Sequence, residues 1–322
     1  MKNPTPLRIN DPIPKREQDA NRLNMPQEPA FPAQPITGQA ISGPTTQSSA
    51  NHAPADPENP PWGIPSAVIT WLSSIALLAL VPNVGVLPYV AYYYRDVPVV
   101  TREVLLKDKT FVFLFVCCWL PAHLITLTLV WAVATRLGKY PIKEVIGWEW
   151  GGGFGIWKSV GLAIVLFFVA LLLIGLFGAE KTDLDRILES SRAAALALAF
   201  LALVTAPLVE EIIYRGLLYS ALQRVIGRWF AVGIVAAMFA GLHVIQYWPN
   251  FGAISAITLL SLVLTIIRAR TGRLLPCFII HLVFNGIQSL IIVFEPYLQQ
   301  LFNLWRHQSA NGVLTGIWGV LN

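Results

Sequence analysis

The chain has 322 residues, of which 55% are hydrophobic and 13% are charged, and its formal net charge at pH 7 is +5. Soluble domains carry charge on about a quarter of their residues, so this composition excludes an ordinary soluble protein and predicts that most of the chain lies in a lipid bilayer. The basic residues are scattered through short loops and do not gather on one face. We therefore expect no nucleic-acid partner.

Residues 1–61 are rich in Pro, Gln, Asn, Ser, Ala and Thr, with runs such as PQEPAFPAQPITGQ. Such a composition cannot assemble a core, so we predict a disordered, Pro-rich N-terminal tail at 1–61. The start lacks a basic stretch followed by an apolar run. We therefore expect no cleavable signal peptide, and insertion would depend on the first internal span.

From Trp62 onward, apolar runs long enough to cross a bilayer core of about 30 Å follow one another with short polar breaks. We expect spans near 64–94, 110–134, 157–178, 193–214, 229–246, 252–267 and 274–294. The predicted fold class is an all-α, polytopic transmembrane helix bundle of about seven or eight spans with a disordered N-terminal tail. The uncertain eighth span is the short run GVLTGIWGVL in a predicted C-terminal tail at 297–322.

The first predicted span is longer than one crossing and contains Pro82 and Pro88. It is therefore either a tilted, kinked helix or a crossing followed by a short interfacial or re-entrant piece. Together with the basic break at 95–109 it forms a first transmembrane region at 62–109.

The break RARTGR at 268–273 is strongly basic, which predicts that it faces the cytoplasm. Seven crossings then place the N-terminal tail in the cytoplasm as well. The break at 95–109 contradicts this orientation unless the first long span makes two passes, and that change would move the conflict elsewhere.

Ionisable side chains inside the spans are the candidate functional residues, because each costs about 2.5 kcal/mol or more in hydrocarbon. Glu211 and Arg215 are four apart and share a helix face, whereas Glu210 points about a quarter turn away. Arg215 is expected to neutralise Glu211 and to leave Glu210 free as a general base. The alternative is a solvated charge cluster at a helix end.

Two histidine motifs follow on later spans. His243 ends FAGLH, four residues after Phe239, and His281 lies four residues before Asn285 in HLVFN. Each motif could serve packing alone, since buried imidazoles and amides bridge membrane helices. As a set with the acidic motif, they supply a base, a proton donor and oxyanion donors, as hydrolysis of an amide by water requires. His123 has no polar companion at helical spacing and is interpreted as packing.

These residues resemble the CPBP family, the CAAX-protease and bacteriocin-processing intramembrane proteases also called the Abi family. The family pattern EExxxR, FxxxH and HxxxN matches EEIIYR at 210–215, FAGLH at 239–243 and HLVFN at 281–285, each on its own expected span. The resemblance covers roughly 110–294, so we assign the protease core to 110–296.

The resemblance implies an intramembrane endopeptidase in which Glu210 activates the attacking water with help from His243. It further implies that His281 and Asn285 stabilise the oxyanion, and that Glu211 and Arg215 support the site. No metal is expected, although the family was long labelled metalloprotease and a zinc held by the histidines and a glutamate is the alternative.

The implied partner is a peptide or protein substrate, membrane-associated or lipidated, and the expected location is the bacterial inner (cell) membrane. The rival function is a non-catalytic or transport-like membrane protein that uses the same Glu, His and Asn residues as a proton relay or ligand site. The chain shows no repeated halves, which argues mildly against transport.

Overall fold

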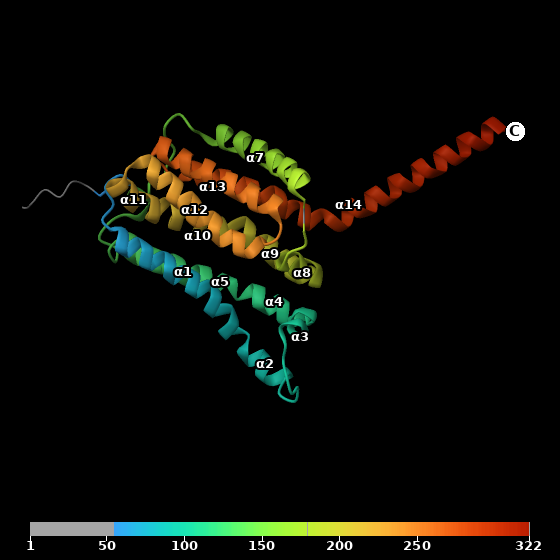
Figure 1. The fold of residues 1–322 in the computed structure, drawn as a ribbon, viewed down its shortest axis with the longest axis horizontal. Helices are drawn as coiled ribbons and strands as arrows, with labels where there is room; N and C mark the ends of the chain where they lie inside the picture. Colours follow the sequence, from blue (N-terminus) through green and yellow to red (C-terminus); the bar gives the residue numbers. More distant parts are fainter. Residues whose placement is uncertain (1–54, 179, 322) are drawn as a thin grey trace, which may run out of the picture. The chain divides into compact units, whose positions relative to one another are not determined.

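The computed structural model describes residues 55–178 and 180–321, and the predicted tail segment 1–54 lies outside the described residues. Within the described part, the chain is helical and contains no β-strand, which confirms the predicted all-α class (Figure 1). The segment 55–61, which we expected at the end of the tail, is bound to the bundle. Its carbonyl groups at Pro57 and Pro60 accept hydrogen bonds from Gln223 and Arg224.

The helices in chain order are α1 Ile64–Gly85, α2 Leu87–Tyr93, α3 Arg102–Lys107, α4 Lys109–Cys117, α5 Trp119–Ala134, α6 Ile142–Ile146, α7 Ile156–Phe177, α8 Asp183–Ser190, α9 Arg192–Phe200, the π-helical η1 Leu201–Thr205, α10 Ala206–Glu211, the π-helical η2 Ile212–Leu218, α11 Tyr219–Ile226, α12 Arg228–Tyr247, α13 Phe251–Thr271 and α14 Leu275–Leu321. Seven stretches of the described residues are long and apolar enough to cross a membrane, and all seven coincide with predicted spans. The chain is an integral membrane protein.

The first span consists of two helices. α1 contains Pro82 and ends at Gly85, and α2 begins at Leu87 with Pro88 in its first turn. Proline has no N–H to donate and its fixed φ suits the start of a helix, so Pro88 favours a new helix at this point.

The fourth span does not end at Tyr214 as predicted. Its helical stretch runs over 35 residues, Arg192–Ile226, through α9, η1, α10, η2 and α11. The predicted span ended just before Arg215. Arg215 is fully buried and paired inside the bundle, so its charge does not end the span.

The basic break at 268–273 is also partly helical. α13 continues to Thr271, and Arg268 is 1% exposed. Arg268 therefore belongs to the interior and does not count as a loop charge. At the C-terminal end, α14 continues beyond the predicted core boundary at residue 296, with Pro296 inside the helix.

The interrupted fourth span lies between two groups of helices (Figure 1). α1 and α5 pack against each other and against η2 on one side, while α12 and α14 contact the same span on the other side. α13 packs on α12, and α7 covers α13 and α14. Half of the most apolar stretch of the fourth span is buried, the largest share among the seven described spans. This position places its side chains at the centre of the bundle.

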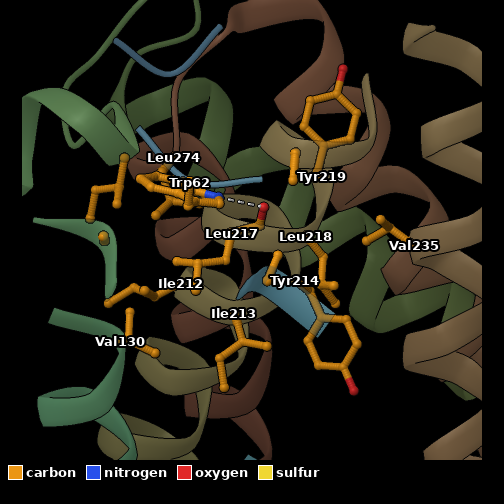
Figure 2. Close-up of a cluster of buried hydrophobic side chains, with 14 of the residues drawn as sticks. Trp62, Val130, Ile212, Ile213, Tyr214, Leu217, Leu218, Tyr219, Val235 and Leu274 are labelled. Carbon is orange, nitrogen blue, oxygen red and sulfur yellow. Dashed lines mark hydrogen bonds between the residues drawn. The ribbon is translucent and has the colours of Figure 1, made fainter. Parts of the chain in front are cut away.

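The residues of η2 form the middle of the main hydrophobic cluster. Figure 2 shows Ile212, Ile213, Leu217 and Leu218 packed between Val130 of α5 and Val235 of α12. In a water-soluble domain, burying apolar surface stabilises the fold by about 25 cal/mol per Å², so side chains of this size would account for much of its stability. In a bilayer, close packing takes over that role, so the fit of η2 against its neighbours fixes its position.

Asp108 joins the first two spans outside the membrane-spanning segments. Its carboxylate caps α4 by accepting from the N–H groups of Thr110 and Phe111, and it accepts from the hydroxyls of Tyr89 and Tyr94 at 2.8 and 2.9 Å. Partial burial acts to raise the pKa of Asp108, but the hydrogen bonds from Tyr89, Phe111 and Tyr94 outweigh it and lower the pKa below its usual value. Burial of Tyr94 and its hydrogen bond to Asp108 raise the pKa of Tyr94 to about 12.

Candidate active site

The two glutamates lie on a short α-helix between two π-helical turns. η1 precedes α10 and η2 follows it, and Glu210 and Glu211 are the last two residues of α10. In each π turn a backbone N–H bonds to the carbonyl five residues earlier: Ala206 to Leu201, and Tyr219 to Tyr214. π turns inside α-helices are rare and occur frequently at functional sites.

Glu211 and Arg215 form an ion pair in the interior. Nη1 of Arg215 donates to Oε1 of Glu211 at 2.9 Å, and both side chains are 0% exposed. Oε2 of Glu211 has no hydrogen-bond partner among the described side chains and backbone groups. The pairing agrees with the spacing of these residues in the sequence. Since Glu211 is engaged, Glu210 is the acidic group with solvent-accessible surface, at 27%.

The remaining N–H groups of Arg215 bind α13. Nε donates to the hydroxyl of Thr265 at 3.2 Å, and Nη2 donates to the carbonyl and hydroxyl of Ser261. The guanidinium also lies 4.7 Å from the centre of the Phe239 ring, within the range of a cation–π contact. Every edge of the guanidinium is thus engaged, as a buried cation requires.

His281 lies between the two glutamates. Its Nδ1 is 2.8 Å from Oε1 of Glu211, and its Nε2 is 3.7 Å from Oε2 of Glu210. Arginine stays protonated in proteins, so its partner Glu211 is ionised and can only accept hydrogen bonds. Nδ1 of His281 therefore carries a proton, and Nε2 is the ring nitrogen that faces Glu210.

His243 approaches the cluster through an aromatic stack. The ring of Phe239 lies 4.4 Å from that of His243 and 6.1 Å from that of His281, stacked on the first and edge-on to the second. Nδ1 of His243 donates to the carbonyl of Phe239 at 2.9 Å, because a carbonyl can only accept. In the neutral imidazole, Nε2 of His243 is consequently an acceptor.

Asn285 contacts the first π turn. Its Nδ2 donates to the carbonyl of Ala202 at 3.0 Å. Ala202 would bond to the N–H of Ala206 in a regular α-helix, but that N–H bonds to Leu201 instead. One of the two amide hydrogens of Asn285 is thus engaged by backbone and one is left for another acceptor.

Two residues beside the cluster were missed from the sequence, Ser261 and Thr265, which hold Arg215. Phe239 was named in the FxxxH motif, and its ring contacts Arg215 and both histidines. Polar residues four apart in an otherwise apolar span, as in SLVLT, were the signal that would have found the first two. His123, which we interpreted as packing, bonds through Nδ1 to the hydroxyl of Thr205 at 2.7 Å.

The histidines and Glu210 keep donor atoms that a zinc could use. Oε1 of Glu211 and Nδ1 of both histidines are engaged with protein groups, which leaves Nε2 of His281, Nε2 of His243 and the carboxylate of Glu210. Among the described residues, no three His, Cys, Asp or Glu side chains lie together as a group that could hold a metal ion, whereas catalytic zinc sites use three protein ligands.

The fold and the site define a polytopic helical membrane protein with a Glu–Arg–His–Asn cluster inside its bundle. Residues 192–287 match the family model described as type II CAAX prenyl endopeptidase, Rce1-like, which agrees with the resemblance to CPBP intramembrane proteases. The match supports, at the level of the family, an intramembrane endopeptidase, a class whose substrates are peptides or proteins in a lipid environment. All six polar residues of the three motifs fall within the matched segment. Neither the comparison with curated proteins nor that with solved structures gives a match.

Proposed function

We propose that the chain hydrolyses a peptide bond with a water molecule that Glu210 deprotonates. The observation that carries this proposal is the arrangement about His281, whose two ring nitrogens face Glu211 and Glu210. Glu211 is neutralised by Arg215, so Glu210 is the carboxylate free to accept a proton. Its side chain is 27% exposed, so protein groups do not enclose it completely.

In this proposal Glu210 takes up one proton and later releases it, so it ends the reaction as it began. The carboxylate takes one proton from water while the oxygen forms a bond to the carbonyl carbon of the substrate. The resulting tetrahedral oxyanion collapses, the C–N bond breaks, and Glu210 returns the proton to the leaving amine. Products are a carboxylic acid and an amine, and no other reactant is consumed.

The histidines and the asparagine take the remaining roles. Nε2 of neutral His243 accepts a hydrogen bond from the water, since Nδ1 donates to Phe239. His281 donates to the oxyanion from Nε2 in its doubly protonated form, in which the charges of Glu210, Glu211, Arg215 and His281 sum to zero. The second amide hydrogen of Asn285 is the other oxyanion donor.

No step in this mechanism uses a metal. Support comes from Asn285, four residues after His281, because a side-chain amide is a poor zinc ligand and a good oxyanion donor. The zinc alternative, in which a metal would activate the water, is separated from this proposal by the chelator experiment in the Discussion.

For the substrate, we propose a membrane-associated peptide that carries a lipidated C-terminal segment, the class suggested by the description of the family. The test is cleavage by detergent-purified protein of a farnesylated peptide, the same peptide without the lipid, and an unrelated peptide library. Cleavage of the farnesylated peptide alone supports the proposal. Equal cleavage of the peptide with and without farnesyl would show that the lipid is not required. Absence of cleavage of every peptide would contradict the protease function.

We also propose that the chain lies in a bacterial inner membrane with its N-terminal tail in the cytoplasm. Arg270 in the last turn of α13 and Arg273 just after it support this orientation, although the buried Arg268 no longer counts. In a cysteine-free background, Arg270→Cys should be protected from an impermeant thiol reagent in intact cells and should react after lysis. Labelling in intact cells would reverse the orientation.

A further inference from the structure

Both π turns leave a backbone carbonyl without its α-helical partner. In η2 the N–H of Tyr219 bonds to Tyr214, so the carbonyl of Arg215 does not receive it. In η1 the N–H of Ala206 bonds to Leu201, which leaves the carbonyl of Ala202 in the same position. Buried carbonyls need a donor, and a side chain from elsewhere in the bundle can take the place of the missing α-helical N–H.

A side chain from another helix supplies each donor. Asn285 of α14 donates to Ala202, and Nε of Arg268 in α13 donates to the carbonyl of Arg215 at 3.0 Å. Arg268 is 1% exposed and also donates to the hydroxyl of Ser220 at 3.0 Å and to the carbonyl of Gly272. It thus uses a buried cation, which is costly to place, on the backbone of the helix that carries the glutamates.

A second donor holds η2 from the opposite side. The indole N–H of Trp62, which precedes α1 and is 4% exposed, donates to the carbonyl of Leu217 at 3.1 Å (Figure 2). Arg268 and Trp62 come from α13 and from the segment before α1, so they fix η2 between two separate parts of the bundle.

The conformation of η2 determines which way the glutamates point. A π turn contains one more residue than an α turn, so relaxation of η2 to an α-helix would rotate its two flanks by about 100° relative to each other. α11 packs more extensively on α12 than α10 packs on α14 or α5, and the rotation would therefore fall mainly on α10. Glu210 and Glu211 would then turn away from His281.

We propose that Arg268 is a positioning residue for the site: by bonding to the carbonyl of Arg215 it holds η2 in the π conformation that directs Glu210 and Glu211 toward His281. Trp62 assists from the other side of the same turn. The proposal rests on the proposed function for its kinetic readout, but its structural readout is independent of catalysis.

The experiment uses the full chain in detergent with the variant Arg268→Lys, which keeps the charge and removes the Nε donor. We expect kcat to fall by about three- to tenfold, the range of one lost hydrogen bond, with KM within about twofold of wild type. Amide hydrogen exchange should become faster by about tenfold in peptides covering 206–218 and should stay unchanged in α7. The control Arg224→Lys removes a bond to a loop carbonyl, that of Pro60, and should leave exchange in 206–218 as in wild type.

A milder variant covers the case in which Arg268→Lys does not fold. Trp62→Phe keeps an aromatic ring and removes the donor to Leu217, and it should show the same fall in kcat and the same local increase in exchange. Its control is Trp71→Phe, which removes an indole N–H that donates to the hydroxyl of Tyr214, a side chain of the same turn, and leaves the backbone carbonyls alone.

The outcomes separate this proposal from the protease function. Wild-type kcat and exchange in folded Arg268→Lys, or equal exchange in Trp62→Phe and Trp71→Phe, would overturn the positioning role. If the wild-type protein cleaves no peptide, the protease function is wrong. The positioning role is then decided by amide hydrogen exchange in 206–218 alone, compared between each variant and its control.

Discussion

His281 and Glu211 are joined by a hydrogen bond of 2.8 Å between Nδ1 and Oε1, and this bond orients the imidazole ring. Glu211 is held ionised by Arg215, so Nδ1 must donate and Nε2 is directed at Glu210. The second glutamate of the EExxxR motif therefore acts on the site indirectly, by setting the orientation and proton position of an imidazole. A carboxylate that orients a histidine has this role in many enzymes.

Glu210→Gln should abolish proteolysis without unfolding the protein. The amide has the same shape but cannot take a proton from water, and general bases contribute about 10²- to 10⁴-fold to a rate. Peptide cleavage and the melting temperature in detergent are the two measurements. Glu58→Gln, an exposed change in the segment before α1, is the control and should retain activity. Turnover at the wild-type rate in Glu210→Gln would exclude Glu210 as the base.

Arg215→Ala should strongly reduce the yield of folded protein. It leaves Glu211 as a buried charge without a cation and removes the bonds to Ser261 and Thr265, and losing one partner of a buried pair costs about 3–5 kcal/mol. The melting temperature in detergent checks this. Lys181→Ala breaks the exposed pair with Glu189 and should shift the melting temperature little, because water and salt screen such pairs. Equal melting temperatures of Arg215→Ala and wild type would contradict the buried position.

The positions of the spans were predictable because each is a long apolar run with polar flanks. The end of the fourth span was not, since Arg215 is buried with the help of Ser261 and Thr265, which lie on another helix. Helical spacing did predict the Glu211–Arg215 pair, as it depends on one helix alone. The contact of His281 with Glu211 and the donors to the π turns depend on how separate helices pack, which spacing within one motif does not contain.

Stability near the junction of the first two spans should depend on pH through Asp108. The folded pKa of Asp108 lies below its usual value of about 4, so the ionised carboxylate stabilises the fold above that value, and the contribution is lost as pH falls through the folded pKa. We expect the melting temperature to decrease between about pH 4 and more acidic values. Asp108→Asn retains a capping oxygen and should weaken this decrease. Asp96→Asn, which alters an exposed pair with Arg95, should leave it unchanged, and an unchanged acid response in Asp108→Asn would exclude Asp108 as its source.

Prolonged treatment with a strong chelator should leave proteolysis intact. In the proposed mechanism Glu210 alone activates water, and elemental analysis of the active protein should find no stoichiometric zinc. If zinc were instead held by His243, His281 and a glutamate, its removal should abolish turnover and its return should restore it, because metal-bound water would be the nucleophile.

The bonds of His281 to Glu211 and of His243 to Phe239 do not by themselves decide between the two mechanisms, since zinc-bound histidines also donate their other N–H. The observation that favours the metal-free route is Asn285, four residues after His281, whose amide is a poor zinc ligand and a good oxyanion donor. Chelator-sensitive cleavage with one zinc per chain would replace Glu210 by the metal as the activator of water and would keep the endopeptidase assignment.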